Sequence, residues 1–222
     1  MNVGVLLAAG ASSRMGRPKA LVRAHGQSFL AQGVRHLWAA CDTVVAVLGA
    51  EARPIRTAAE AEFAALVESG ALTSQLRARG GRRTRELELH FVEHRAWRQG
   101  LLSSARAGLA EAVALRARGV LVLPVDHPDV RPATVAQLAA MLEQALRAFG
   151  GRAAGTLAYA LVPRYRGRRG HPLALSPALA RAIVADRGAA DLGDAVRRSA
   201  RLVGYLDVAD PGVLTNVNRP RR

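Results

Sequence analysis

A loop of small and basic residues follows the first apolar run of the sequence, and its composition suits an anion. Residues 10–19 read Gly-Ala-Ser-Ser-Arg-Met-Gly-Arg-Pro-Lys. Small residues let backbone N–H groups approach phosphate oxygens closely, and Arg14 and Lys19 add positive charge. The loop is neither a P-loop nor a G-x-G-x-x-G dinucleotide fingerprint. We therefore predict a phosphate-binding loop of another kind; an ordinary strand-to-helix loop with incidental basic residues is the alternative.

Lys19 is the only lysine among the 32 basic residues of the chain. Lysine carries a compact ammonium, whereas arginine carries a planar fork, so the two are not interchangeable at every site. Retention of lysine in so arginine-rich a chain favours a position that needs the compact charge, with chance as the alternative.

A carboxylate ends a second apolar run, because Asp126 follows Val-Leu-Val-Leu-Pro-Val at residues 120–125. A carboxylate at the mouth of a buried strand is costly unless it is paired or binds a metal. Magnesium suits it, since Mg²⁺ is held by one or two carboxylates together with substrate phosphates. The alternative is that Asp126 caps the helix expected from Pro132, although five residues separate the two.

Two histidines, His127 and His171, each precede a proline. Both lie on loops that we expect near the edge of the sheet that carries Asp126. A structural role for each imidazole is the alternative to a role in binding.

Short apolar runs alternate with amphipathic helical patterns, which predicts an α/β fold. The first 50 residues read strand, loop, helix, strand, the βαβ unit of a parallel sheet. Expected strands cover residues 3–9, 43–48, 86–93, 120–125, 156–162 and 202–208, and expected helices begin near Ser28, Pro54, Ser103 or Ser104, Pro132, Pro177 and Asp191. Ligands of open parallel sheets bind at the carboxyl ends of the strands, which is where residues 10–19 and Asp126 fall.

The composition is that of a globular chain. The 222 residues fit one domain, 1–222, and 50% of them are hydrophobic, which excludes a mainly disordered or fibrous protein. The single cysteine, Cys41, excludes a disulfide framework and favours a reducing compartment, the cytoplasm. No apolar run reaches the roughly 18–20 residues of a membrane helix, and no signal peptide is recognisable. The net charge of +15 reflects an arginine bias, so nucleic-acid binding is not expected.

Residues 7–19, Leu-Ala-Ala-Gly-Ala-Ser-Ser-Arg-Met-Gly-Arg-Pro-Lys, match the L-A-A-G-x-S-x-R-M-G-x-P-K signature of nucleotidyltransferases. The sequence most closely resembles the molybdenum cofactor cytidylyltransferases. Agreement continues at Gly100, Ser103 and Ser104, and at residues 107–109, 124–128 (Pro-Val-Asp-His-Pro), 169–172 (Arg-Gly-His-Pro) and 216–220 (Asn-Val-Asn-Arg-Pro). The resemblance implies a three-layer Rossmann-like nucleotidyltransferase fold, with a mostly parallel central sheet flanked by helices. It covers nearly the whole chain except an atypical insertion around 51–90.

The resemblance also implies roles for the matching residues. Nucleotide contacts are implied for Leu7, Ala8, Ala9, Gly10, Arg14, Lys19, Ser103 and Ser104. Catalytic roles are implied for Lys19, Arg14 and Asp126, with Mg²⁺ bound by Asp126 and by Asn216, which stands where the family often has aspartate. His127 and His171 are expected on the side of the acceptor.

The expected reaction is transfer of CMP from CTP to the terminal phosphate of molybdopterin, with release of pyrophosphate. Two alanines after Leu7 favour cytidine, because guanylyl-transferring relatives typically carry L-A-G-G. An apo-molybdoenzyme is a plausible partner, and no membrane partner is expected. One alternative is a transferase that uses another nucleotide, such as GTP, or another phosphorylated acceptor, such as a sugar phosphate. The other is a non-catalytic basic protein that binds a cofactor or nucleic acid.

Overall fold

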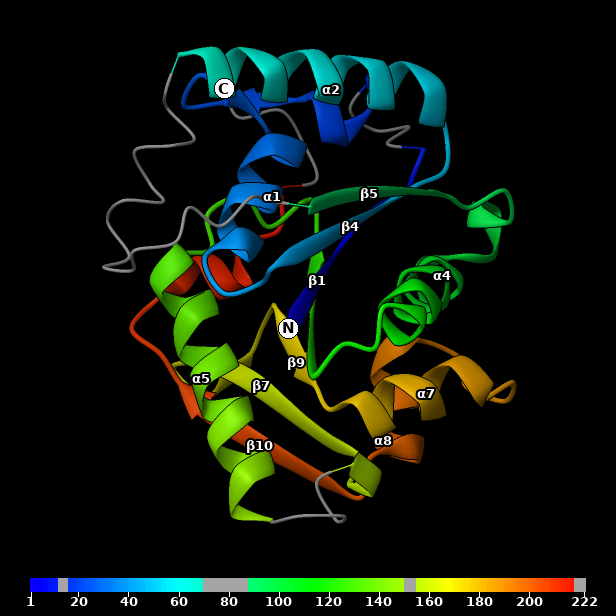
Figure 1. Ribbon diagram of the computed structural model, residues 1–222, viewed down its shortest axis with the longest axis vertical. Helices are drawn as coiled ribbons and strands as arrows, with labels where there is room; N and C mark the ends of the chain where they lie inside the picture. The colour runs from blue at the N-terminus through cyan, green and yellow to red at the C-terminus, as the bar shows by residue number, and fades with distance from the viewer. Residues whose placement is uncertain (12–15, 70–87, 150–154, 218–222) are drawn as a thin grey trace.

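The computed structural model describes residues 1–11, 16–69, 88–149 and 155–217. Arg14, the basic segment 77–85 and Arg219 lie outside the described residues. Within the described ranges, eight strands form one sheet in the order β10-β7-β9-β6-β1-β4-β5, with β8 paired to β7 at one end. The sheet is mostly parallel and helices cover both of its faces (Figure 1), so the expected α/β architecture is confirmed.

The middle of the sheet consists of three buried parallel strands. Strand β1 (Asn2–Ala8) lies between β4 (Thr43–Leu48) and β6 (Gly119–Pro124). Their continuous apolar sequences are typical of strands covered on both faces. The remaining strands of the sheet are β5 (Glu88–Glu93), β7 (Tyr159–Tyr165), β8 (Arg168–Arg169), β9 (Leu173–Leu175) and β10 (Leu202–Asp207).

Helices form the two outer layers of the described part of the chain (Figure 1). Helices α1 (Phe29–Trp38), α2 (Ala52–Glu68) and α5 (Pro132–Ala148) lie on one side of the sheet. Helices α4 (Leu101–Ala114), α7 (Pro177–Ala185) and α8 (Leu192–Ser199) lie on the other. Shorter elements are the hairpin β2 (Arg23–Ala24) and β3 (Gln27–Ser28), and the 3-10 turns η2 (Lys19–Leu21), η3 (Trp97–Gln99) and η4 (Pro211–Leu214).

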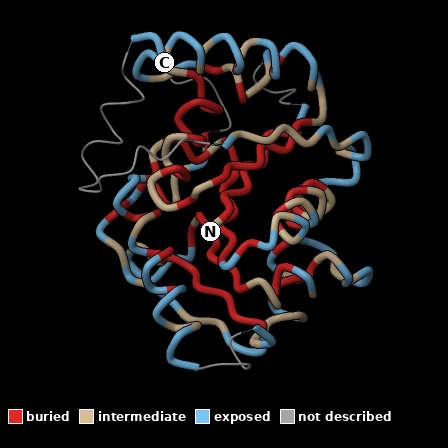
Figure 2. Tube along the Cα trace, in the orientation of Figure 1, coloured by how far each residue is buried: buried red, intermediate tan, exposed pale blue. Residues whose placement is uncertain are grey.

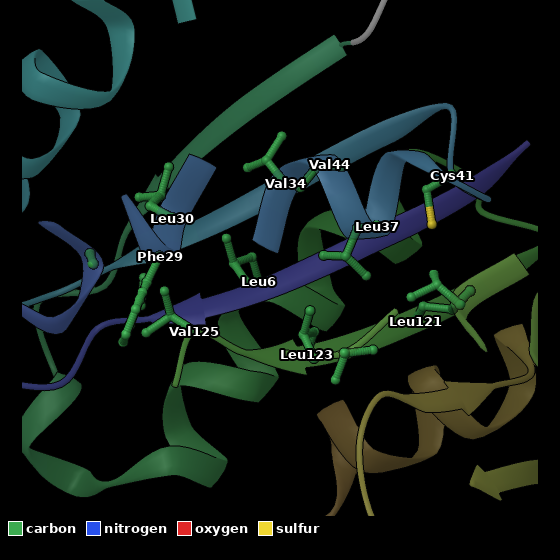
Figure 3. Close-up of a cluster of buried hydrophobic side chains, with 14 of the residues drawn as sticks. Leu6, Phe29, Leu30, Val34, Leu37, Cys41, Val44, Leu121, Leu123 and Val125 are labelled. Atoms are coloured by element: carbon green, nitrogen blue, oxygen red, sulfur yellow. The ribbon is translucent and has the colours of Figure 1, made fainter. Parts of the chain in front are cut away.

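Each face of the sheet has its own hydrophobic core, because successive side chains of a strand point to opposite faces. Leu6 of β1 packs in the cluster under α1 and α5, whereas Val5 and Leu7 pack in the cluster under α4 and α7. Figure 2 shows the buried chain concentrated along the central strands, and Figure 3 shows Leu6 among Val34, Leu37 and Leu123. Full burial of one such leucine contributes roughly 1.5–3 kcal/mol, so the central strands form a rigid support for the loops at their ends.

Most predicted helix starts agree with the structure. Helix α1 begins after Ser28, whose hydroxyl accepts a hydrogen bond from the Ala31 N–H at 3.1 Å. Helix α7 begins at Pro177, behind the similar cap Ser176. Helix α5 begins after Arg131, which serves as its N-cap residue, so the alternative that Asp126 caps this helix is wrong.

Three boundary predictions were wrong. Helix α4 begins at Leu101 instead of Ser103 or Ser104, because Gly100, at φ 100°, turns the chain into the helix without a side-chain cap. The sequence also predicts that this helix ends at Gly119, but it ends at Ala114 and Gly119 belongs to β6. The strand expected from Thr156 begins at Tyr159.

None of the helices in the described ranges is long and apolar enough to cross a membrane. Helix α2 and strand β5, which pairs in parallel with β4, occupy most of the described part of residues 51–90. The atypical insertion expected there stays a prediction.

Candidate functional site

The residues that sequence analysis singled out gather along the edge where the parallel strands end. Strands β1, β4 and β5 run in parallel and lead to Ala9, Gly49 and His94. Strand β6, also parallel to β1, leads through Val125 to Asp126. This is the edge at which open α/β sheets bind ligands.

Lys19 and Asp126 meet at this edge. The Lys19 Nζ atom lies 3.0 Å from Asp126 Oδ2, and the two side chains are only 18% and 17% exposed. The turn η2 that carries Lys19 is anchored by Ala20 and Val22, which are buried in the core beneath α1. Lys19 and Asp126 therefore form one ion pair, although they are 107 positions apart in the sequence.

A segment from near the described C-terminal end also reaches Asp126. The N–H of Val217 donates to the Asp126 carbonyl at 2.8 Å. Asn216, the exposed residue that precedes Val217, is the second metal ligand that sequence analysis predicted. Asn216 contributes an amide oxygen and Asp126 a carboxylate, and both are ligand types that hard divalent cations accept.

Asp210 fastens that segment to the start of α5. It is only 2% exposed, and its carboxylate accepts hydrogen bonds from the Arg131 N–H, the Thr134 hydroxyl and the Gly212 N–H at 2.7–2.9 Å. A carboxylate buried with three donors is stabilised, whereas one without donors would be costly. Sequence analysis did not identify Asp210, because its donors are distant in the sequence.

Backbone groups of small residues line the side of the edge that follows β1. Leu7, Ala8 and Ala9 are nearly fully buried. The Leu7 carbonyl accepts from the Val125 N–H at 3.0 Å and the Ala9 carbonyl accepts from the Ala50 N–H at 3.1 Å. These bonds join β1 to the chain segments after β6 and β4. Gly10, the next residue, is exposed and has no atom within 4 Å of where a Cβ would stand, so the loop enters open space there.

Ser103 and Ser104 lie in the first turn of α4, at the same edge. The Ser104 hydroxyl is buried and lies 3.4 Å from the Gly100 carbonyl, which it bonds within the turn. The Ser103 Oγ atom lies 2.7 Å from His94 Nε2 and 3.3 Å from Gln99 Oε1. Sequence analysis missed His94, although its position just after an expected strand was a usable signal.

The two predicted histidines form a pair beside Asp126. The ring centres of His127 and His171 are 4.9 Å apart in an edge-on arrangement. Burial is the main cause that lowers the pKa of His127, and burial together with the nearby His127 lowers the pKa of His171 to about 4. Both imidazoles are therefore neutral near pH 7. The Nδ1 atom of each is buried without a hydrogen-bond partner among the described residues.

The hairpin formed by β7 and β8 extends the edge beyond His171 with arginines. The guanidinium groups of Arg164 and Arg169 lie 4.8 and 5.2 Å from the ring centre of Tyr205. Arg164 also donates two hydrogen bonds to the Asp207 carboxylate, at 3.0 and 2.8 Å. Stacking on the aromatic ring and pairing with the carboxylate hold these arginines in place.

The edge thus combines an ion pair, small-residue backbone and two neutral imidazoles. Across the described ranges, no three His, Cys, Asp or Glu side chains group closely enough to hold a metal by themselves. Asp126 could supply one carboxylate to a divalent cation whose other ligands come from a bound phosphate, as is usual for magnesium. Such an edge is suited to binding a polyphosphate and neutralising its charge.

Comparison with known proteins agrees with this description. Residues 4–202 match the model of the MobA-like NTP transferase domain. A curated relative, nicotine blue oxidoreductase from Paenarthrobacter nicotinovorans, is 30% identical over 213 residues, covering 93% of this chain and 87% of that protein.

Solved structures share the fold. Rv0371c from Mycobacterium tuberculosis H37Rv is 24% identical with a TM-score of 0.63, covering 93% of this chain and 87% of that one. Molybdopterin-guanine dinucleotide biosynthesis protein A from Archaeoglobus fulgidus is 19% identical with a TM-score of 0.56, covering 99% and 93%. The cytidylyltransferase of 2-C-methyl-D-erythritol 4-phosphate from Thermus thermophilus is 20% identical with a TM-score of 0.52, covering 96% and 91%.

Proposed function

The chain belongs to the MobA-like NTP transferase family and is a nucleotidyltransferase, and we propose that it transfers CMP from CTP to the terminal phosphate of a molybdopterin-type acceptor. The observation that carries the proposal is the ion pair between Lys19 and Asp126 at the end of the parallel strands. It supports a site in which the Lys19 ammonium contacts the triphosphate and the Asp126 carboxylate binds a cation.

The chemistry fits the residues at the edge. A phosphate monoester has a second pKa near 6, so the acceptor phosphate is largely a dianion at pH 7 and needs no general base. One of its oxygens forms a bond to the α-phosphorus of CTP, and the bond from that phosphorus to the bridging oxygen of pyrophosphate breaks. The electron pair leaves with pyrophosphate. In this scheme Lys19 and Arg14 neutralise the phosphate oxygens, and positioning and charge neutralisation supply the rate enhancement.

Asp126, with Asn216 beside it, would hold the divalent cation of this reaction. The oxygen donors of the two side chains suit Mg²⁺, and a complex of Rv0371c with manganese supports a divalent cation in this fold. When bound, the cation neutralises phosphate charge. The backbone bond from Val217 to the Asp126 carbonyl, which ties the chain next to Asn216 to Asp126, supports this proposal.

Cytidine is the proposed base on the strength of the two alanines after Leu7, because Ala9 stands where the L-A-G-G pattern of guanylyl-transferring relatives has its first glycine. The comparisons include one protein named for guanine dinucleotide synthesis and one named as a cytidylyltransferase, so GTP is the competing substrate. A screen of CTP, GTP, ATP and UTP with Mg²⁺ would discriminate them by the pyrophosphate released.

The acceptor side of the site is proposed to consist of His127 and His171. Their buried, neutral imidazoles each keep one nitrogen without a partner among the described residues, and a polar acceptor group could bond it. The basic hairpin next to His171 would favour an anionic acceptor or the acidic face of an apo-molybdoenzyme. We place this activity in the cytoplasm, in keeping with the single cysteine, Cys41, which is buried.

The decisive experiment is incubation of the purified protein with CTP, Mg²⁺ and molybdopterin cofactor, with mass detection of the dinucleotide and of pyrophosphate. A cytosine dinucleotide formed in preference to a guanine dinucleotide supports the proposal. Product from GTP alone would replace CTP by GTP, and turnover with a sugar phosphate but not with molybdopterin would replace the acceptor.

The 30% identical relative is named for a redox reaction, so the same preparation should also be assayed with nicotine blue. Turnover of that dye without pyrophosphate release from any nucleotide would overturn the transferase proposal. Variants with Lys19→Ala and Asp126→Ala serve as controls, because both substitutions remove charges on which nucleotidyl transfer depends.

A further inference from the structure

Three short segments that follow one another in the chain bring a histidine, a glutamine and a serine together beside the nucleotide edge. His94 follows β5, Gln99 belongs to η3, and Ser103 lies in the first turn of α4. The Ser103 oxygen is 2.7 Å from the imidazole Nε2 of His94 and 3.3 Å from the amide oxygen of Gln99.

The backbone of His94 is firmly anchored. Its N–H donates to the Leu48 carbonyl at 2.7 Å, which extends the ladder between β4 and β5 by one bond. Its carbonyl accepts from the Trp97 N–H at 3.2 Å, which starts the turn η3. The imidazole therefore reaches Ser103 from a fixed point of the sheet, and both side chains are half-buried.

This contact determines how Ser103 can act on a ligand. A serine hydroxyl has one proton and two lone pairs. If His94 Nε2 is unprotonated, the hydroxyl proton is donated to it. If Nε2 carries a proton, it donates to Ser103, and the hydroxyl proton is directed to Gln99 Oε1, which can only accept. In both cases the hydroxyl proton of Ser103 is donated to a protein acceptor, His94 or Gln99. At least one lone pair of the Ser103 oxygen then stays available to accept a hydrogen bond from a ligand.

We propose that His94, with Gln99, is a positioning residue that fixes the Ser103 hydroxyl as a hydrogen-bond acceptor for a donor group of the bound nucleotide. The donor is either the exocyclic amino group of the base or a ribose hydroxyl. This inference rests on the proposed nucleotide-binding role of Ser103 and adds the direction of its hydrogen bond. It also names a residue that determines nucleotide affinity without touching the reacting phosphates.

The test is equilibrium binding of CTP with Mg²⁺ by calorimetry, together with steady-state kinetics. His94→Ala should weaken CTP binding about five- to ten-fold, the scale of one hydrogen bond, while kcat changes less than two-fold. His94→Gln should restore most of the affinity, because its amide nitrogen can reach the position of Nε2. In the double variant with Ser103→Ala, the loss should be no larger than that of Ser103→Ala alone.

His90→Ala is the matched control. His90 lies on β5, four residues before His94, and its Nδ1 atom contacts Glu111 at 3.4 Å instead of Ser103, so nucleotide affinity should be unchanged. Ligand arms identify the donor group. If the donor is the base amino group, UTP should show no penalty from His94→Ala, and if it is the ribose 2′-hydroxyl, 2′-deoxy-CTP should show none.

The outcomes separate the two proposals. If Ser103→Ala weakens CTP binding but His94→Ala does not, or if the two effects simply multiply, the positioning role is overturned while the transferase stands. If neither variant changes the affinity although transfer proceeds, the roles of both residues are wrong. If the wild-type protein binds no nucleotide, the proposed function fails together with this inference.

Discussion

The two halves of the sheet edge are built in different ways. In the half formed by β1, β4 and β5, small residues and short turns present main chain to the site, and Gly49 approaches so closely that a Cβ would stand 2.5 Å from the Ala9 carbonyl oxygen. The half formed by β6, β9, β7 and β10 instead carries the buried side chains of His127 and Asp210 and the half-buried His171. The antiparallel strand β9 interrupts the parallel order there.

The two halves are suited to different kinds of recognition, one of groups common to all nucleotides and one of a particular class of acceptor. Main-chain groups and one ammonium suit the phosphates that every nucleoside triphosphate shares. Imidazoles and stacked arginines present shapes and charges that suit one class of acceptor. Lys19 and Asp126 lie where the two halves meet, one contributed by each half, so variants at this pair should have the largest effects.

Substitution at the junction should affect the rate most. Lys19→Ala and Asp126→Ala should each lower the rate of nucleotidyl transfer at least about 100-fold, the scale of one preorganised electrostatic group. Pyrophosphate release under saturating CTP and Mg²⁺ is the measurement. Near wild-type turnover by either well-folded variant would remove that residue from the catalytic site.

Helix α4, which packs against β1 and β4 in the nucleotide half, should tolerate little added side-chain volume. A Cβ at Gly108 of α4 would stand 2.4 Å from Val5 Cγ1 and 2.8 Å from Val47 Cγ2, so Gly108→Ala should lower the free energy of unfolding by about 1–3 kcal/mol. Urea denaturation measures this. Gly10→Ala is the matched control, since no atom lies within 4 Å of its Cβ position, and its unfolding midpoint should equal that of the wild type.

The acceptor half should respond in acceptor affinity alone. His171→Ala removes a half-buried imidazole that we propose to contact the acceptor, so the KM for the phosphorylated acceptor should rise about five- to ten-fold, as for loss of one hydrogen bond. The KM for CTP should not change. A rise in both constants, in a variant whose melting temperature matches the wild type, would show that the two halves do not act separately.

A histidine between the halves should make stability depend on pH. His36 of α1 faces Asp210 and Asp129, yet burial, followed by the charge of Arg35, lowers its pKa from 6.5 to about 4. The unfolded chain therefore binds this proton more readily, and stability falls as the pH drops from about 6.5 towards 4. Between pH 7.5 and 5.5 the free energy of unfolding should fall by about 1 kcal/mol on this account. Urea titrations should show a smaller drop in His36→Gln, and an equal drop would assign the effect to other groups.

The features that could be predicted from the sequence are those formed by contiguous residues. Residues 7–19 form one contiguous motif, so the loop and Lys19 could be found without a structure. The apolar runs of β1, β4 and β6 predicted the central strands for a similar local reason, since strands buried on both faces are apolar throughout.

The other features depend on chain segments that meet only in the fold. Nothing local predicts that Asp210 accepts from Arg131 and Thr134, or that His94 reaches Ser103. The start of α4 was missed because serine is a common capping residue, while here Gly100 turns the chain two residues before Leu102. The strand order predicted that Lys19 and Asp126 lie at the same edge of the sheet, but their ion pair was not predicted.

The hydrogen bond from Val217 to Asp126 can form only late in the synthesis of the chain. A ribosome releases the phosphate-binding loop and Lys19 early, but the segment that completes the surroundings of Asp126 emerges almost two hundred residues later. A nascent chain that has folded its first strands still lacks this closing contact. The order of synthesis thus delays this hydrogen bond until the chain has been made at least as far as Val217.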